Sequence, residues 1–330
     1  MPRYTPTADE LAALEAFWPW LGSARQPQRG VSAGEVRLGV VLDALANPAA
    51  RMQVVAGVQS VFDQANAAGG VHGRRLRLIG MNRAWSEEAF ALVASAPLPS
   101  TQQALRKLRL PSIASLDFQL RDADPGGWQW PLLPSLQQQA RMAVEQLESA
   151  PPNCMRRTFD PKHWSGAANS DTAPTVPTTE QPLCVAALAP ATDVDALRTR
   201  WRADGIKVRQ LIELSGMRPK LLTEPYLEHQ LVLSVPLAVA DQAEQQGQSL
   251  WFVLGQASAR TLVEALARSG PSVVPESLLV QMRTLTGFAP LPGAPLAYSR
   301  SSAHGWRPEI YSPASPSSRS SDQRPRKELP

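Results

Sequence analysis

Long apolar runs are missing from this sequence, which limits what the chain can be. No apolar stretch in the 330 residues approaches the ~20 residues that a membrane-spanning helix needs. The first residues also lack the basic segment followed by an apolar segment that marks a secretory signal peptide. We therefore expect no membrane span, and nothing in the printed residues would direct export.

Catalytic motifs are equally scarce. The four histidines are scattered, and neither an HExxH motif nor a Ser-His-Asp order can be built around them. The glycine-containing stretches VLGQAS and GGVHG match neither the Walker pattern nor GxGxxG. The sequence thus predicts a protein that is not an enzyme and has no metal site.

Cysteine is also rare. Cys154 and Cys184 lie in or beside a proline-rich stretch and have neither the paired spacing of a zinc site nor the CxxC of a redox motif. Two interpretations stay open from the sequence. The pair could form a disulfide in an oxidising compartment, or they are unrelated thiols, of which Cys184 is buried in a strand.

Basic residues exceed acidic ones only slightly, 33 against 29, and much of the excess lies in the C-terminal tail. A nucleic-acid-binding face needs Lys and Arg gathered on one folded element, whereas the helices expected here mix both signs. We therefore expect no nucleic-acid partner. A chain of this length with 43% hydrophobic residues can form two compact lobes, each with its own core.

Strands and helices alternate from residue 36 onward. Residues 36–42, VRLGVVL, form a short apolar run of the kind found in buried parallel strands. Residues 49–68 carry apolar side chains at helical spacing and stop at a Gly-Gly pair, and residues 74–81 alternate as a second strand. The pattern predicts a β-α-β unit.

The same residues carry a resemblance to a known family. The stretch 35–79 resembles the opening of the type I periplasmic binding proteins, the leucine/isoleucine/valine receptor family. Seven positions match that family's N-x-A-G-G-V-x-G-R turn, namely Asn66, Ala68, Gly69, Gly70, Val71, Gly73 and Arg74. The glycines permit a left-handed helix end, and Arg74 is expected to lean back on the last helical carbonyls. The motif identifies a scaffold and needs no contact with ligand.

The resemblance implies a shortened α/β fold of two Rossmann-like lobes with mainly parallel sheets. Residues 34–150 would form the first lobe, completed by about 256–288. Residues 183–255 would form the second lobe, completed by about 289–313. Residues 151–182 are expected to be a flexible linker and residues 314–330 a disordered tail.

Two stretches depart from the family or are ambiguous. Between residues 83 and 100 the family has a further strand ending in a glycine-rich loop. Here residues 86–95 suggest a helix, and the strand is expected to be missing or reduced to 96–99. Residues 249–255, SLWFVLG, suggest a strand that precedes a helix over 257–269.

Residues 1–33 form a separate segment. The words MPRYTPTADELAALEAFWPWL resemble the C-terminal end of a class I cytochrome c, with Met1 at the axial-ligand position. The chain has no CxxCH for haem attachment, so a haem is expected only if such a segment precedes Met1. A plain N-terminal amphipathic arm explains the same residues. The family resemblance implies a periplasmic protein whose printed start is too late.

Five residues are candidate ligand contacts in the cleft between the lobes, because strand ends and helix starts meet there. Ser100 and Thr101, at a helix start, would bind an anion such as a carboxylate, with Ser115 and Asp117 beside them. The alternative is that they serve only as helix caps and turn formers. Asp43 would receive an ammonium group, or it is a solvated loop acid.

In the second lobe, Glu224, Tyr226 and Glu228 are the residues that could reach an amine. The sequence thus predicts a monomer that binds a small polar solute, amino acid-like or related, and presents it to an ABC transporter permease or a sensor. The alternative is an accessory protein on a degenerate receptor fold, with a periplasmic redox partner in a cytochrome-linked oxidation system. Three features favour this alternative: the expected missing strand, the cytochrome-like start, and a first loop, 43–47, that lacks the proline and small-residue pattern usual in amino acid receptors.

Overall fold

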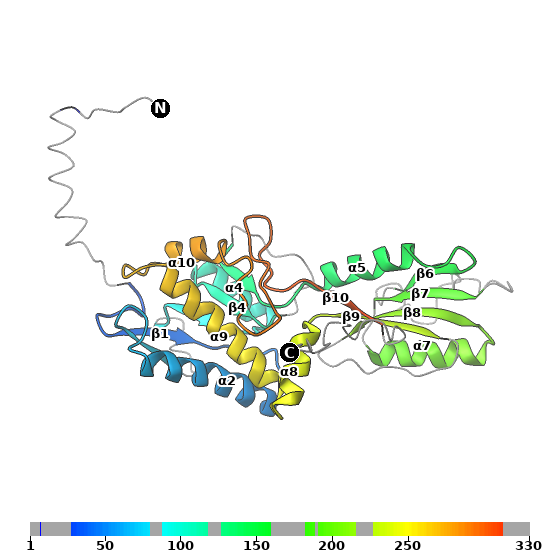
Figure 1. Cartoon of the computed structure of the whole chain (residues 1–330), viewed down its shortest axis with the longest axis horizontal. Helices are drawn as coiled ribbons and strands as arrows, with labels where there is room; N and C mark the ends of the chain where they lie inside the picture. The colour runs from blue at the N-terminus through cyan, green and yellow to red at the C-terminus, as the bar shows by residue number, and fades with distance from the viewer. Residues whose placement is uncertain are drawn as a thin grey trace, which may run out of the picture.

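The chain folds into two lobes, each built on a five-stranded sheet (Figure 1). The computed structural model describes residues 7, 28–79, 88–117, 127–159, 182–188, 191–215 and 227–312. The cytochrome-like pattern of residues 1–33 lies outside the described residues except for residues 7 and 28–33. The tail 314–330 also lies outside them.

The first sheet is entirely parallel, with the order β2-β1-β3-β4-β5. Its strands are short and rich in buried apolar residues, as parallel sheets covered on both faces require. The chain passes from β1 to β2 on one side and then returns to place β3 on the other side of β1. The strands are β1 (Glu35–Gly39), β2 (Arg75–Ile79), β3 (Ala91–Val93), β4 (Ser112–Ser115) and β5 (Gln129–Pro131).

Strand β3 corrects two predictions. The strand expected to be missing is present at Ala91–Val93, in the middle of the sheet, and no helix spans the described part of 86–95. All three of its residues are buried, so the segment shows no alternation of polar and apolar positions. A fully buried strand this short cannot be told from a helical segment by its pattern.

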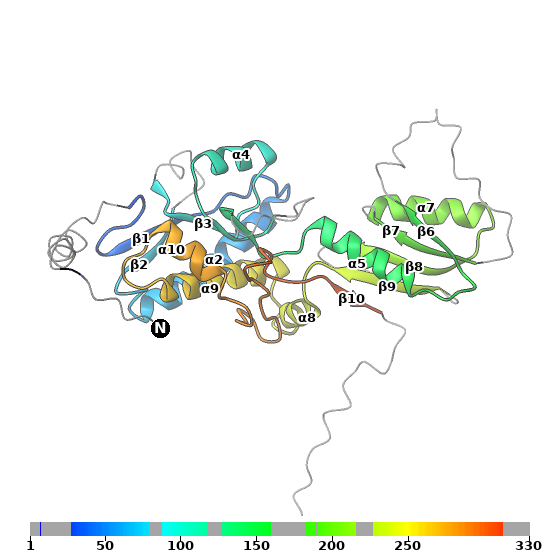
Figure 2. The same cartoon turned by 90° about the horizontal axis from the view of Figure 1, so that it is seen from above.

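Helices cover both faces of the first sheet. Helices α2 (Pro48–Ala67) and α9 (Leu250–Arg268) lie side by side on one face, and α4 (Pro99–Lys107) packs on the other (Figures 1 and 2). Helices α8 (Leu237–Gln245) and α10 (Pro275–Met282) pack against α9. The predicted strand at 249–255 is wrong, because these residues form the first turns of α9 and their apolar side chains face the core.

Helices α2 and α9 cross in backbone contact. A Cβ on Gly57 would collide with the carbonyl of Phe252, and a Cβ on Gly255 would collide with the carbonyl of Val54. Each glycine therefore lets the other helix approach closer than any side chain would allow. The crossing joins the start of the lobe to a segment that returns from the second lobe.

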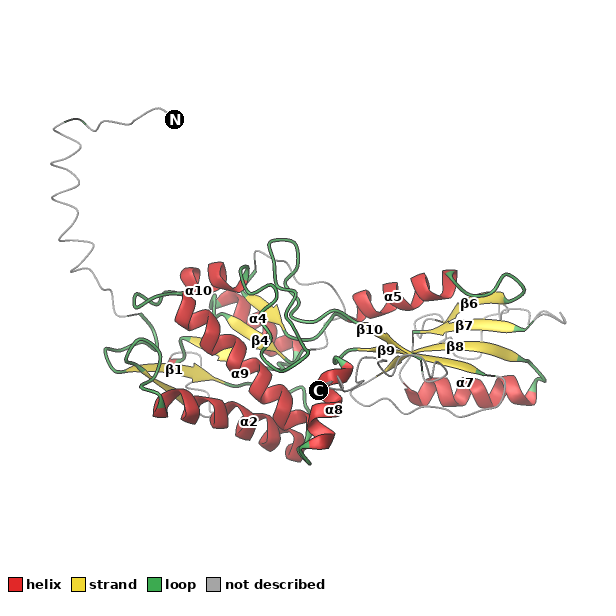
Figure 3. Ribbon diagram, viewed as in Figure 1, coloured by secondary structure: helices red, strands yellow, loops and turns green. Residues whose placement is uncertain are grey.

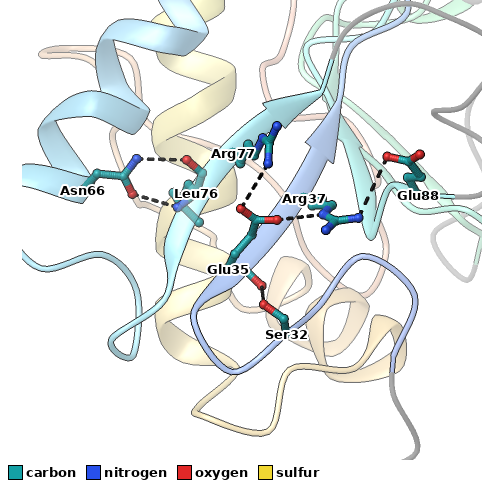
Figure 4. Close-up of polar contacts among 7 residues, drawn as sticks. All are labelled: Ser32, Glu35, Arg37, Asn66, Leu76, Arg77 and Glu88. Atoms are coloured by element: carbon teal, nitrogen blue, oxygen red, sulfur yellow. Dashed lines mark hydrogen bonds and ion pairs between the residues drawn. The ribbon is translucent and has the colours of Figure 1, made fainter.

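In the turn motif after α2, the side chain of Asn66 connects the helix to strand β2. The Asn66 side-chain amide donates to the Leu76 carbonyl at 2.9 Å and accepts from the Leu76 N–H at 2.7 Å (Figure 4). The Asn66 amide thus satisfies the N–H and the carbonyl of Leu76, which a neighbouring strand would otherwise bond. The expected role of Arg74 is wrong: its guanidinium donates to the carbonyls of Ser32 and Pro271, not to those at the end of α2.

Charged side chains line the beginning of strands β1 and β2. Glu35 accepts from Arg37 at 2.7 Å and lies 3.6 Å from Arg77, as Figure 4 shows. The hydrogen bond from Arg37 lowers the pKa of Glu35. Exposed charges on the edge strand β2 also discourage pairing with another chain.

The second sheet has the order β10-β9-β8-β7-β6, with β10 antiparallel to β9 and the others parallel. Helices α5 (Leu136–Glu148) and α7 (Ala191–Ala203) cover its two faces (Figure 3). The strands are β6 (Met155–Phe159), β7 (Leu183–Ala187), β8 (Val208–Ser215), β9 (Glu228–Leu233) and β10 (Glu309–Tyr311).

Several segments belong to a different lobe from the one predicted. Helix α8, expected in the second lobe with 183–255, packs against α9 in the first. Residues 289–313 were expected to complete the second lobe, but only β10 does so, because the buried residues of 291–306 lie in the core of the first lobe. Helix α5 was expected in the first lobe, but it packs on β7, β8 and β9. Strand β6 was expected to be part of the linker, but it forms an edge of the second sheet. The sequence pattern predicts the apolar face of α5. It does not predict which sheet that face covers, because amphipathicity carries no information about the packing partner. Residues 160–181 of the expected linker lie outside the described residues.

A disulfide settles the two interpretations of the cysteines. Cys154, just before β6, is bonded to Cys184 in β7, with the Cα atoms 5.7 Å apart. Both residues are buried under α5. The bond links two neighbouring strands at the edge of the second sheet.

Gly255→Ala is expected to lower the free energy of unfolding by about 1–3 kcal/mol, because the added methyl group must push α2 and α9 apart. This loss should appear although alanine favours helix more than glycine does. Gly34→Ala is the matched control, because no atom lies within 4 Å of its added Cβ. Denaturant unfolding measures both, and an equally stable Gly255→Ala would contradict the close crossing.

Replacing both cysteines by alanine is expected to lower the free energy of unfolding by about 3–4 kcal/mol, since the bridge closes a loop with a sequence separation of 30. Thermal unfolding with and without a reductant measures the effect. The reductant should destabilise the natural protein and leave the alanine variant unchanged. If both respond alike, the bridge does not contribute as the loop length implies.

Candidate functional site

The candidate site lies where the strands of the first sheet end. All five strands are parallel, so the loops that follow them meet at one edge of the sheet. Strand β5 continues directly into 132–135, which enters α5 of the second lobe. This edge therefore faces the second lobe.

Asp43 and Thr101, two of the five predicted residues, meet at this edge. Asp43 follows β1, and its two carboxylate oxygens have different partners. The Leu98 N–H donates to Oδ1 at 2.8 Å and the Thr101 hydroxyl donates to Oδ2 at 2.6 Å. Leu98 is the N-cap residue of α4 and offers no side-chain oxygen of its own. Asp43, in the loop after β1, thus acts as the side-chain cap of α4.

The loops after β1 and β3 are also joined by their backbones. The Ala96 N–H donates to the Val41 carbonyl at 2.7 Å, and the Ala44 N–H donates to the Ala96 carbonyl at 3.0 Å. The hydroxyl of Ser95, which is fully buried, accepts from the Val41 N–H at 3.2 Å. Ser95 is a site residue that the sequence did not suggest, because the strand before it was interpreted as a helix.

Two alanines at this edge adopt a left-handed backbone. Ala94, just after β3, has φ of 50°, and Ala114, in β4, has φ of 47°. This conformation costs an L-residue roughly 1–2 kcal/mol relative to glycine. Both residues are fully buried. Backbone strain held by surrounding packing is common at ligand-binding edges.

The other three predicted residues, Ser100, Ser115 and Asp117, do not contact Asp43 in the described hydrogen bonds. Asp117 accepts from the Gln102 side chain at 3.0 Å, and the same amide of Gln102 contacts Gln129 at 3.1 Å. Ser115, at the end of β4, is 2% exposed and lies beneath the surface. Ser100 is exposed on the first turn of α4. The structure thus groups Asp43 with Thr101, and Asp117 with two glutamines.

A depression of about 430 Å³ lies between the N-terminal ends of α2 and α9. The sequence did not suggest it, since the apolar residues 249–255 were interpreted as a strand. Three of its lining residues are polar and four are apolar. The lining residues are Asn47, Ala49, Ala50, Gln53, Ser249, Leu250 and Trp251.

The second lobe contributes less to the described site. Of its three predicted residues, Glu224 and Tyr226 lie outside the described residues. Glu228 is the first residue of β9 and lies at the end of that strand that points away from the lobe junction. The buried side chains of His229 and Glu213 contact each other at 2.6 Å between β9 and β8. The loops 160–181, 189–190 and 216–226 that follow β6, β7 and β8 lie outside the described residues.

Three segments of the described chain connect the lobes, at 132–135, 234–236 and 307–308. Each contains a proline, which fixes one backbone angle. The segment before β10 pairs with the first connection: the Gly305 N–H donates to the Pro131 carbonyl and the Trp306 N–H to the Leu132 carbonyl, both at 2.8 Å. The first and third connections are therefore hydrogen-bonded to each other.

A buried tyrosine anchors this junction. The Tyr298 hydroxyl donates to the Pro131 carbonyl at 3.0 Å, and its ring meets Trp130 edge to face at 5.7 Å. Burial raises the pKa of the Tyr298 phenol well above its ordinary value. The His304 ring contacts the Leu133 carbonyl at 2.9 Å.

In the part of the chain that the structure describes, no group of three or more metal-ligating side chains comes together. Among the same residues, none of the helices has the length and apolarity to cross a bilayer.

No family model matches the sequence, and no curated protein matches it. Solved structures, however, have the same fold. A fatty acid ABC transporter substrate-binding protein from Thermomonospora curvata has a TM-score of 0.56 at 13% identity, covering 86% of this chain and 90% of the other. A substrate-binding periplasmic protein from Ralstonia solanacearum has a TM-score of 0.51 at 16% identity, covering 83% and 96%.

A third structure, described as a possible leucine/isoleucine/valine-binding protein from Rhodopirellula baltica SH 1, has a TM-score of 0.53 at 14% identity, covering 87% and 95%. Identities this low show the fold alone. The chain has the fold of the type I periplasmic binding proteins, with two parallel-sheet lobes, as the sequence predicted.

The buried phenol of Tyr298 predicts a loss of stability in alkali. Its raised pKa means that the unfolded chain releases this proton at about pH 10, whereas the folded chain retains it to higher pH. The stabilisation is present below about pH 10 and is lost as the pH rises toward the folded value. Tyr298→Phe should remove this part of the pH dependence and, at neutral pH, cost about 1 kcal/mol for the lost hydrogen bond. Denaturant unfolding from pH 8 to about 11 tests this, and identical slopes for the two proteins would contradict it.

Proposed function

We propose that this chain binds a small polar solute, amino acid-like or related, in the cleft between its lobes, and does so without catalysis. The observation that supports this most is the arrangement of the first sheet: its strand ends and the start of α4 face the second lobe across three short connections. Two lobes joined in this way can close around a ligand by a hinge motion. The similar solved structures named as substrate-binding proteins support the same role.

The proposed partner is the permease of an ABC transporter, or a membrane sensor, which would recognise the closed form of a monomer. We also propose a periplasmic location. The disulfide between Cys154 and Cys184 supports it, because such bonds persist in oxidising compartments and are rare in the cytosol.

The accessory role in a cytochrome-linked oxidation system has lost one of its grounds. It rested in part on a missing strand, and β3 is present. The cytochrome-like residues lie almost entirely outside the described residues. Solute binding is therefore the function that we carry forward.

A thermal-shift screen tests the proposal with amino acids, their amides, alcohols and short carboxylates. A solute at 100 times its dissociation constant adds about 2.7 kcal/mol to stability and should raise the melting temperature by several degrees. Small-angle scattering should then show a more compact particle, because the lobes close. If no solute class shifts the melting temperature, the proposal fails.

A further inference from the structure

At the switch point of the first sheet, the loops after β1 and β3 are bonded to each other. The chain leaves β1 for α2 on one face and leaves β3 for α4 on the other, so the loops after these neighbouring strands diverge. In open α/β sheets, ligands bind in the crevice that such diverging loops leave. Here two backbone hydrogen bonds, from Ala96 to Val41 and from Ala44 to Ala96, join the two loops instead.

Side chains also join the two loops. The buried Ser95 hydroxyl accepts from the Val41 N–H. The Asp43 carboxylate then accepts from the Leu98 N–H at 2.8 Å and from the Thr101 hydroxyl at 2.6 Å. One N–H and one hydroxyl at a helix start are the donors that a free carboxylate ligand would use.

We propose that Asp43 is a specificity-determining residue that stands in for a ligand carboxylate and excludes free carboxylates from the first lobe. This inference rests on the proposed function and narrows its ligand. The cleft takes a solute whose polar groups are uncharged or cationic, such as an amide, an alcohol or an amine. A free amino acid would have to displace Asp43 before its own carboxylate reached Leu98 and Thr101.

The displacement is unfavourable for two reasons. Asp43 is tethered to β1 by a short loop, so its carboxylate has a high effective concentration at the two donors. A displaced Asp43 would also remain beside the incoming carboxylate, and like charges in one site repel. A free carboxylate would make the same two contacts, but Asp43 occupies them more favourably.

Chemical rescue tests the role of Asp43 without any knowledge of the natural ligand. Asp43→Ala leaves the Leu98 N–H and the Thr101 hydroxyl without their carboxylate acceptor and should lower the melting temperature by about 5 °C. Sodium acetate should then raise the melting temperature of this variant in a saturable way and restore about half of the loss. The natural protein, measured in acetate against sodium chloride of equal ionic strength, should show no such gain.

Two variants serve as controls. Asp63→Ala removes an exposed aspartate of α2 that bonds only Gln59 in the described contacts, and acetate should not affect it. Asp43→Ala combined with Thr101→Val removes one of the two donors and should weaken the acetate effect at least tenfold. If Asp43→Ala does not fold in plain buffer, it is refolded with and without acetate, and recovery in acetate alone supports the inference.

A matched ligand pair separates this inference from the proposed function. Leucine and leucinamide differ at the carboxylate, and the natural protein is expected to respond to the amide and not to the acid. If the natural protein binds leucine as tightly as its amide, solute binding stands and the role of Asp43 is wrong. If acetate rescues Asp43→Ala but no solute shifts the natural protein, the role of Asp43 stands and the proposed function is wrong. No acetate effect on either the stability or the refolding of Asp43→Ala would overturn the inference.

Discussion

The contact between the backbones of α2 and α9 is the constraint on which the first lobe depends. The two helices are almost 200 residues apart in the chain, since all of the second lobe except β10 lies between them. Gly57 and Gly255 let each helix lie against a carbonyl of the other, an approach that any side chain at either position would prevent. Because α9 returns from the second lobe, this contact completes the first lobe and also fixes where the chain re-enters it.

The position of the site follows from the same contact. It brings the N-terminal ends of α2 and α9 together beside α8, which gives the depression lined by Asn47 and Trp251. It also holds α2, and with it the loop after β1 that carries Asp43. The lobe junction adds a second rigid region, where Tyr298 and Trp306 hold the first connection from one side. In the described part of the chain the lobes are joined by three short segments, each containing a proline, and a hinge motion would bend the backbone there.

The sequence predicted the fold better than it predicted the site, and the reason is physical. Strand β1, helix α2 and the turn at Asn66 are local features, set by apolar periodicity and by glycines that permit a left-handed backbone. Strand β3 and the start of α9 were misassigned, because a short run of buried apolar residues suits either a strand or a helix. The lobe to which α5 belongs could not be predicted, because only tertiary packing decides it.

Asp43 and Thr101 were both candidates from the sequence, yet their contact was not predictable. They are separated by 58 positions, and each residue alone is explained equally well as a ligand contact or as a local cap. Only the order of the strands, with β3 beside β1, brings the two loops together. Where the two loops meet, the roles of Asp43 and Thr101 depend on each other. The carboxylate of Asp43 caps the start of α4 and thereby occupies the donors that a ligand carboxylate would need. The turn at Asn66 thus specifies the scaffold, whereas the choice of ligand depends on a pairing between loops that the scaffold motif does not encode.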